Sequence, residues 1–246
     1  MATIPGGVYR LGGGSGDAGR GAAPREIALA PFRIDRHEVT NRQFARFVAA
    51  TGYRTTAERE GGGWVFRGGT RDWQYVAGAD WRHPLGPGSS LAGGGEYPAV
   101  LVSWYDARAF SGWTGGRLPS EWEWEAAARA GGATDQGAAA AAEAGRANVW
   151  QGRWPQRNLL ADGFFYAAPV GSFASDRLGL YDLIGNVWEW TASAYAAGDS
   201  RPVARGGSWF CSRRYCSSYR PGFRGKCPAD HAFNNVGFRC ARDAAR

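Results

Sequence analysis

Three stretches of the chain combine an N-terminal capping signal with the apolar spacing of a helix. In each, a Ser or Thr side chain stands three residues before an acidic or amide side chain, so that the two can bond each other's backbone amides. The pairs are Thr40 with Gln43, Ser103 with Asp106, and Ser120 with Glu123. After the first pair, Phe44 and Phe47 lie on one apolar face. We predict helices that begin at these pairs and end near Gly52, Gly115 and Gly131.

Short apolar runs between glycines and prolines predict strands elsewhere in the chain. The expected strands are residues 26–29, 187–191, 207–210 and 237–242. Segments 12–24 and 131–145 have a biased composition, and the second contains an unbroken alanine run, 138–142, which fits a short helix as well as a loop. The C-terminal third is therefore expected to consist mainly of strands and loops.

Composition favours a single, loop-rich unit. The 246 residues include 38 Gly and 12 Trp, and 44% are hydrophobic. This composition means many turns and aromatic anchors, with less aliphatic filling than a helical bundle or a parallel α/β sheet needs. We predict an irregular α+β fold in one domain over residues 1–246, with residues 1–3 and 244–246 as peripheral tails.

Charge and hydropathy argue against two classes of partner. The formal charge is +7, but the 29 basic residues are interspersed with 22 acidic ones, which argues against a nucleic-acid interface. No apolar stretch is long enough to span a membrane, and residues 1–14 lack a charged head followed by an apolar run. We expect a cytoplasmic monomer with no nucleic-acid and no membrane partner.

The candidate chemistry lies in four cysteines, all of which follow residue 210. Cys211 and Cys216 are separated by four residues, not by the two of a zinc knuckle, and no His lies nearby to complete a zinc site. Two thiolates suit Cu(I), a soft ion that accepts low coordination. Arg213 and Arg214 between them, with Arg220 beyond, favour the thiolate form.

The cysteine spacing also fits interpretations without a metal. Cys211 and Cys216 can form a structural disulfide or be two unrelated buried thiols, and spacing alone favours these alternatives. Cys227 and Cys240 fit a structural role, either paired with each other or as small buried hydrophobic residues.

Two regions carry oxygen ligands of the kind that calcium prefers. Segments 148–152 and 161–164 supply Asn148 and Asp162, and segment 179–190 supplies Asp182 and Glu189 with backbone carbonyls between them. By itself, the first region also fits an ordinary Asx-turn, and the second fits a turn packed by two tryptophans.

Eight motifs occur in a fixed order along the chain. They are IPGGV (4–8), EVTN (38–41), WRHP (81–84), VSW (102–104), RLPSEWEWE (117–125), GNVWEW (185–190), RGGS (205–208) and GFR (237–239). Together they resemble the sulfatase-modifying factor family over residues 4–243, which implies a heavily looped variant of the C-type lectin fold. Most members of the wider family share this frame without being oxidases, because function depends on the site that a scaffold carries. The formylglycine-generating members have a cysteine pair after RGGS, which Cys211 and Cys216 match.

The resemblance implies a copper- and oxygen-dependent oxidase with a part in sulfatase maturation. Cu(I) would be held by Cys211 and Cys216, and a cysteine thiolate of a sulfatase-like client peptide would bind as third ligand. Molecular oxygen would be reduced as hydrogen leaves the client β-carbon, and hydrolysis of the thioaldehyde would give formylglycine. Ser208 and Tyr215 match positions beside the copper that orient oxygen or water, and Trp188 matches a wall of the cavity.

The same resemblance implies calcium and client sites. One calcium set is Asn148, Val149, Asp162 and Phe164, and the second is Asp182, Gly185, Val187 and Glu189. Their role would be to lock loops that have no regular hydrogen bonding of their own. Glu38 and Arg224 match residues that line the client groove.

The chain departs from the family pattern at three positions. An acidic residue is expected around Gly62, and partner cysteines are expected near Ser111 and Ala127. Cys240 therefore lacks its usual disulfide partner, a place that Cys227 can take.

Other functions stay open alongside the oxidase. A non-catalytic module that binds protein or sugar can use the same fold, and a copper oxidase can act on a different thiol substrate. Iron-dependent sulfoxide synthesis, known from related enzymes with this domain, needs a His cluster in an additional helical domain. His37, His83 and His231 are widely spaced and do not supply that cluster.

Overall fold

The computed structural model describes residues 1–13, 23–68, 70, 72–91, 93–212 and 218–244. The helices of this part of the chain are α1 (Asn41–Thr51), α2 (Thr56–Glu60), α3 (Trp104–Trp113), α4 (Glu121–Ala130) and α5 (Asp135–Glu143). The strands are β1 (Ala2–Ile4), β2 (Gly7–Leu11), β3 (Arg25–Leu29), β4 (Phe32–Ile34), β5 (Gly62–Phe66), β6 (Trp73–Ala77), β7 (Gly152–Arg153), β8 (Arg157–Asn158), β9 (Trp188–Ala194), β10 (Pro202–Arg205), β11 (Gly225–Lys226), β12 (Val236–Gly237) and β13 (Ala241–Asp243).

The three predicted helices begin where their capping signals stand. Thr40, Ser103 and Ser120 each accept a hydrogen bond from the backbone N–H three residues on, and the reciprocal bond completes each capping box. A fourth box, Thr55 with Glu58, begins α2, and the sequence carries that signal as clearly as the other three. The alanine run lies in α5, which confirms the helical alternative for that segment.

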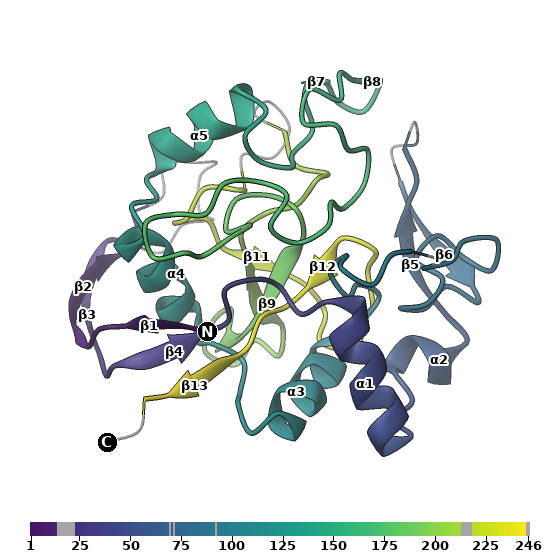
Figure 1. Ribbon diagram of the computed structural model, residues 1–246, viewed down its shortest axis with the longest axis horizontal. Coiled ribbons are helices and arrows are strands. Elements are labelled where there is room, and N and C mark those ends of the chain that lie inside the picture. Colours follow the sequence, from purple (N-terminus) through teal and green to yellow (C-terminus); the bar gives the residue numbers. More distant parts are fainter. Residues whose placement is uncertain (14–22, 69, 71, 92, 213–217, 245–246) are drawn as a thin grey trace.

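Two small sheets organise the fold, one of them in the middle of the molecule and the other towards one side (Figure 1). The larger has the order β11-β10-β9-β12, in which β9 and β12 are parallel and the other pairs are antiparallel. In the smaller sheet, β4 lies between β1 and β13 and is antiparallel to both. Three separate hairpins, β2–β3, β5–β6 and β7–β8, lie at the periphery. Long loops connect these elements, as the glycine content predicted.

Three strand or tail predictions differ from the structure. Residues 207–210 form a turn, because Gly206 and Gly207 have φ angles of 88° and 70° and so end the extended backbone of β10. Segment 237–242 is divided between β12 and β13. Residues 1–3 were expected in a tail, but Ala2 and Ile4 pack into the core and form β1. Residues 245–246 lie outside the described part of the chain.

A hydrophobic cluster joins helices α1 and α3 to the central sheet. The rings of Phe44 and Phe110 stack with centroids 5.8 Å apart, and both meet the edge of Phe238. Trp190 of β9 is fully buried in this cluster, and its indole N–H donates to the carbonyl of Val102 at 3.0 Å. The cluster therefore fixes the position of β9, whose first residue borders the candidate site.

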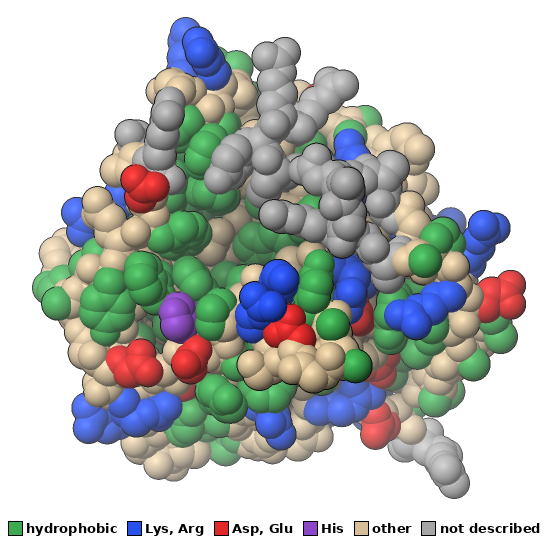
Figure 2. Space-filling view, turned by 180° about the vertical axis from the view of Figure 1, so that it is seen from behind, with side chains coloured by type: hydrophobic (Ala, Val, Ile, Leu, Met, Phe, Trp, Pro, Cys, Tyr) green, Lys and Arg blue, Asp and Glu red, His purple; other side chains and the backbone are tan. Residues whose placement is uncertain are grey.

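The surface carries charges of both signs. On the face seen from behind, acidic and basic side chains are interspersed (Figure 2), as the scattered charges of the sequence predicted. Among the helices that the structure describes, none has the length and apolar content needed to cross a membrane.

Candidate active site

Cys211 lies in a loop that leaves β10 through two glycines; we call residues 206–223 the cysteine loop. The structure describes its two arms, 206–212 and 218–223. A Cβ atom at Gly207 would lie 2.7 Å from the backbone of Tyr219, closer than real Cβ contacts allow. The second glycine of RGGS is therefore needed for the close approach of the two arms.

The Cys211 thiol is fully buried between polar groups of both arms. The backbone N–H of Ser208 points at the sulfur with a distance of 3.4 Å, and the hydroxyl of Ser218 lies 2.9 Å from it. The Ser208 N–H is a donor to the sulfur and so favours a thiolate, and the Ser218 hydroxyl lies where it can donate or accept. The arrangement thus prepares Cys211 to act as a soft anionic ligand or nucleophile.

The side chain of Ser208 lies near Cys211, and its part in orienting oxygen or water stays a prediction. Its hydroxyl oxygen is 4.0 Å from the Cys211 sulfur and accepts a hydrogen bond from the side chain of Asn235 at 3.0 Å. No local signal in the sequence points to Asn235, because it is 27 residues away from Ser208 and reaches it only through the pairing of β12 with β9.

Trp188 begins β9 and packs on the same cluster as Cys211. Its ring centroid is 6.0 Å from that of Phe223, which belongs to the second arm of the cysteine loop. Its backbone N–H donates to the carbonyl of Asn235 at 2.9 Å. Trp188 is therefore held between the sheet and the cysteine loop, where a wall of the site was expected.

Cys216 and Tyr215 lie outside the described residues, as do Arg213 and Arg214. The pairing of the two thiols and the influence of the two arginines on them therefore stay predictions.

Arg205, the first residue of RGGS, joins the cysteine loop to helix α4. The side chain is fully buried, and its Nη1 donates to the carbonyls of Pro221 and Phe223 at 2.9 and 3.0 Å. Its Nη2 donates to the carboxylates of Glu121 and Glu125 at 3.1 and 3.2 Å. A planar guanidinium can hold both sets of partners at once. Arg205, at the start of the cysteine loop, thus fixes the position of the end of the loop at Pro221 and Phe223.

Arg224 is engaged with the interior of the protein. Its guanidinium forms two bonds with Glu121, at 2.6 and 2.8 Å, and donates to the carbonyl of Tyr195 at 2.8 Å. The side chain is 14% exposed. Arg224 lies just beyond the cysteine loop, but a client would have to compete with Glu121 for its charge.

Glu38 was expected to line a client groove, and the structure does not support that placement. The residue is 1% exposed, and both carboxylate oxygens accept from the side-chain amide of Asn186, at 3.1 and 3.2 Å. Burial, and then the nearby carboxylates of Asp182 and Glu189, raise the pKa of Glu38 well above its usual value. Glu38 is an interior group, and its sequence position alone could not reveal this.

The first calcium set is brought together by a turn around Asp162. The carboxylate of Asp162 accepts from the backbone N–H groups of Val149 and Phe164 at 3.2 and 3.0 Å, and from the side chain of Gln151 at 2.6 Å. The side-chain oxygen of Asn148 is buried and has no hydrogen-bond partner among the described residues. An unpaired buried amide oxygen and a carboxylate oxygen are ligands of the kind that a hard cation such as calcium prefers.

The second calcium set fits a cation less well. Both oxygens of Glu189 are bonded to the guanidinium of Arg239 at 2.7 Å, and one also accepts from the indole of Trp124 at 2.8 Å. Arg239 therefore already neutralises the Glu189 carboxylate, whose negative charge a calcium ion would need. Burial raises the pKa of Asp182 to about 6, which disfavours its ionised form. Gly185 and Val187 lie in the turn between these two acidic residues.

Clusters of metal-binding side chains give no further candidate. The described part of the chain contains no group of three or more His, Cys, Asp or Glu residues that could hold a metal ion. Backbone and amide oxygens, which both calcium sets would use, are not part of such a group.

Cys227 and Cys240 are free thiols in the structure, so they do not pair with each other. Burial raises the pKa of both to about 12, which makes them poor nucleophiles. The sulfur of Cys240 is 3.2 Å from the hydroxyl of Ser111, the position where the family pattern has a partner cysteine. Ser111 thus has a hydroxyl where the family pattern has the sulfur that would pair with Cys240, and the two side chains stay in contact.

Comparison with known proteins gives a consistent assignment. Residues 1–244 match the family described as the sulfatase-modifying factor enzyme 1-like domain. A formylglycine-generating enzyme of Thermomonospora curvata is 40% identical over 286 residues, which cover 99% of this chain and 93% of that protein. A protein of Bos taurus named inactive C-alpha-formylglycine-generating enzyme 2 is 42% identical, with 100% of this chain and 89% of that protein covered.

Two solved structures share the fold. PvdO from Pseudomonas aeruginosa superimposes with a TM-score of 0.68 at 24% identity, over 98% of this chain and 93% of PvdO. Variable protein 1 of Treponema denticola gives a TM-score of 0.65 at 20% identity, over 99% of this chain and 95% of that one. These likenesses support the predicted single-domain, loop-rich α+β fold of the C-type-lectin-like class. Family and fold agree with the motifs from residue 4 onward, and the chain belongs to the sulfatase-modifying factor enzyme family.

Proposed function

We propose that this protein oxidises a cysteine of a client peptide to formylglycine, using copper and molecular oxygen. The observation that carries the proposal is the environment of Cys211, a buried thiol with a backbone N–H directed at its sulfur and a serine hydroxyl within hydrogen-bonding distance. A thiol that served only as core filling would not need these polar partners. Relatives named formylglycine-generating enzymes support the same activity.

Cys211 and Cys216 would hold Cu(I). The described half of this donor set fits a soft ion, because donors near the Cys211 sulfur favour the thiolate that Cu(I) binds. Copper bound there would supply the electron transfer that activates oxygen.

The chain's own residues would prepare the client for this chemistry. The rings of Trp188 and Phe223 pack together beside the cysteine loop, where they would limit the access of water. The Ser208 hydroxyl, oriented by Asn235, is proposed to position oxygen or water, and Tyr215 is proposed to assist. Two electrons and two protons leave the client CH2–SH group to give a thioaldehyde, and water replaces sulfur and releases hydrogen sulfide. A thiol reductant would supply the two further electrons that complete the reduction of oxygen to water.

The client is proposed to be a sulfatase-like protein, and calcium is proposed to bind at the first of the two oxygen sets. Calcium there would hold the loop around Asp162 against Asn148. Calcium would have a structural role here and would take no part in the chemistry at Cys211.

A non-catalytic binding module is the second candidate function. Relatives named inactive are as similar to this chain as those named as enzymes, at 42% and 40% identity. The pair Cys211 and Cys216 favours the enzyme, because a module that only binds has no use for two thiols after RGGS.

The test is aerobic turnover of a peptide containing Cys-X-Pro-X-Arg by Cu(I)-loaded protein with added dithiothreitol, followed by mass spectrometry. Cys211→Ala and Cys216→Ala should abolish aldehyde formation, whereas Cys227→Ala, a matched control outside the site, should retain it. If the two thiolates bind Cu(I) but no aldehyde forms, the protein would act on a different thiol substrate. Absence of Cu(I) binding would favour the binding module.

A further inference from the structure

A cavity of about 380 Å³ lies between the start of helix α1 and the loop that contains residues 166 and 167. Its described lining includes neither Ser208, Cys211 nor Trp188, which are the residues of the proposed active site that the structure places around the thiol. The volume falls within the usual range for small-molecule sites, roughly 300–1,000 Å³. The cavity therefore needs an explanation of its own.

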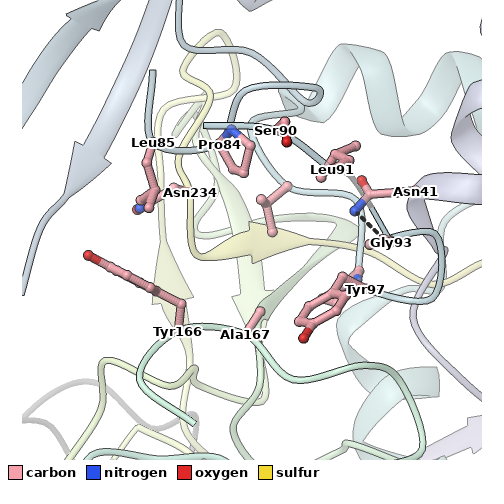
Figure 3. Close-up of a pocket in the computed structure, with 13 residues that line it drawn as sticks. Asn41, Pro84, Leu85, Ser90, Leu91, Gly93, Tyr97, Tyr166, Ala167 and Asn234 are labelled. Carbon is pink, nitrogen blue, oxygen red and sulfur yellow. Dashed lines mark hydrogen bonds between the residues drawn. The ribbon is translucent and has the colours of Figure 1, made fainter. Parts of the chain in front are cut away.

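The walls of the cavity are mainly apolar and, among the residues that the structure describes, uncharged. Figure 3 shows Leu91 and Asn41 on one side, Leu85 on the opposite side, and Tyr97 and Ala167 along the lower edge. None of the residues that line the cavity has an acidic or basic side chain. Because burial of an ion without a partner is costly, such walls favour a neutral occupant.

One polar atom in the wall lacks a partner. Asn41 is 3% exposed, and its side-chain oxygen has no hydrogen-bond partner among the residues that the structure describes. The amide orientation is fixed, because the nitrogen of the same group donates to the carbonyl of Gly94 at 3.3 Å. In Figure 3 the Asn41 side chain reaches into the cavity from helix α1. A buried acceptor without a donor is costly, and a ligand donor would satisfy it.

The other amide in the wall is already satisfied. Asn234 accepts from the backbone N–H of Phe66 and donates to its carbonyl, both at 3.1 Å. Among the buried side-chain atoms of the described lining, the Asn41 oxygen is thus the acceptor that has no partner.

We propose that this cavity binds a small neutral molecule that combines an apolar ring with one hydrogen-bond donor. The ring lies between Leu85, Leu91 and Ala167, and the donor bonds the Asn41 oxygen. This site is additional to the proposed oxidase and does not depend on copper or on a client.

Indole and 1-methylindole are matched probes, since they share the ring and only indole has an N–H donor. With the full chain, isothermal titration should show indole binding roughly five- to tenfold more tightly than 1-methylindole, the effect of one hydrogen bond. Equal affinity of the two probes, or no indole binding up to its solubility limit, overturns the proposal.

Ala167→Phe fills the cavity and should weaken indole binding at least tenfold. Ala28→Phe is the matched control, because Ala28 is exposed on β3 and far from the lining residues. Retention of indole affinity in Ala167→Phe, in a variant that unfolds at the wild-type temperature, overturns the assignment of the site. The readout is binding alone, so failure here leaves the oxidase proposal untouched, and the reverse also holds.

Discussion

At the scale of single residues, Asn186 joins three segments in the interior. Its side-chain oxygen accepts from Asn148 and from the backbone of Ala168, at 3.0 and 2.8 Å, and its nitrogen donates to Glu38. Its φ of 56° is a conformation that Asn tolerates better than most residues. Asn186 therefore donates a hydrogen bond to a buried carboxylate, and it also tolerates a backbone conformation that would strain most other residues.

Asn186→Ala should destabilise the protein by about 3 kcal/mol or more, because it leaves the Glu38 carboxylate buried without its donor. Urea unfolding followed by circular dichroism measures the loss. Glu38→Gln in the Asn186→Ala background should recover part of it, since a neutral amide costs less to bury than a carboxylate. A loss below about 1 kcal/mol, or no recovery in the double variant, would contradict the role assigned to Asn186.

Ser111 gives a second prediction at this scale. Its hydroxyl is 3.2 Å from the Cys240 sulfur, so Ser111→Cys should place two sulfurs within reach of a disulfide. The bond should raise the free energy of unfolding by about 2–4 kcal/mol, and dithiothreitol should remove the gain. Non-reducing peptide mapping identifies the bridge, and Ser111→Ala serves as control. Failure of the variant to oxidise in air would show that the backbone at this position has moved away from the disulfide geometry.

At the scale of elements, the sequence predicted local structure well and long-range contacts poorly. The capping boxes at Thr40, Ser103 and Ser120 located three helices, because a cap depends on residues three positions apart. The turn at 207–210 was mistaken for a strand, since two positive φ angles override an apolar pattern. The bond between Ser208 and Asn235 depends on strand pairing, which no local signal encodes.

Arg205 of β10 bonds both helix α4 and the cysteine loop, so a substitution of Arg205 should change how often the loop opens. Arg205→Lys keeps the positive charge but loses the planar guanidinium. That group bonds the carbonyls of Pro221 and Phe223 and the carboxylate of Glu125 at the same time. Maleimide labelling of Cys211 under native conditions should become roughly tenfold faster, because the loop opens more often.

The matched control for this experiment is Arg239→Lys. Arg239 is an equally buried arginine that pairs with Glu189, and its other hydrogen bonds go to carbonyls outside the described arms of the cysteine loop. Both variants should lose stability, but only Arg205→Lys should accelerate labelling of Cys211, as read by mass spectrometry of the labelled peptide. Equal labelling rates in the two variants would mean that Arg205 stabilises the whole fold and not the loop in particular.

At the scale of the whole molecule, calcium should stabilise the fold through the first oxygen set. At a hundredfold excess over the dissociation constant, a bound ligand adds about 2.7 kcal/mol, or roughly 5–10 °C in Tm for a chain of this size. Differential scanning calorimetry with calcium and with EDTA measures the shift. Asn148→Ala should abolish it, whereas Asp182→Asn should retain it, because Arg239 already neutralises the second set. A shift lost in Asp182→Asn and kept in Asn148→Ala would reverse this assignment.

The three-stranded sheet has a consequence for the connectivity of the chain. Ala2 and Ala241 pair with the same residue, Ile34, from opposite sides of β4, and the two outer strands run parallel to each other. Strand spacing and rise place Ala2 and Asp243 about 12 Å apart, two strand widths across and two residues along. A linker of about six residues would therefore close the backbone into a ring. The chain could then be reopened at the exposed loop around Leu159 and Leu160, giving a circular permutant in which β1 and β13 are joined in the interior of the sequence.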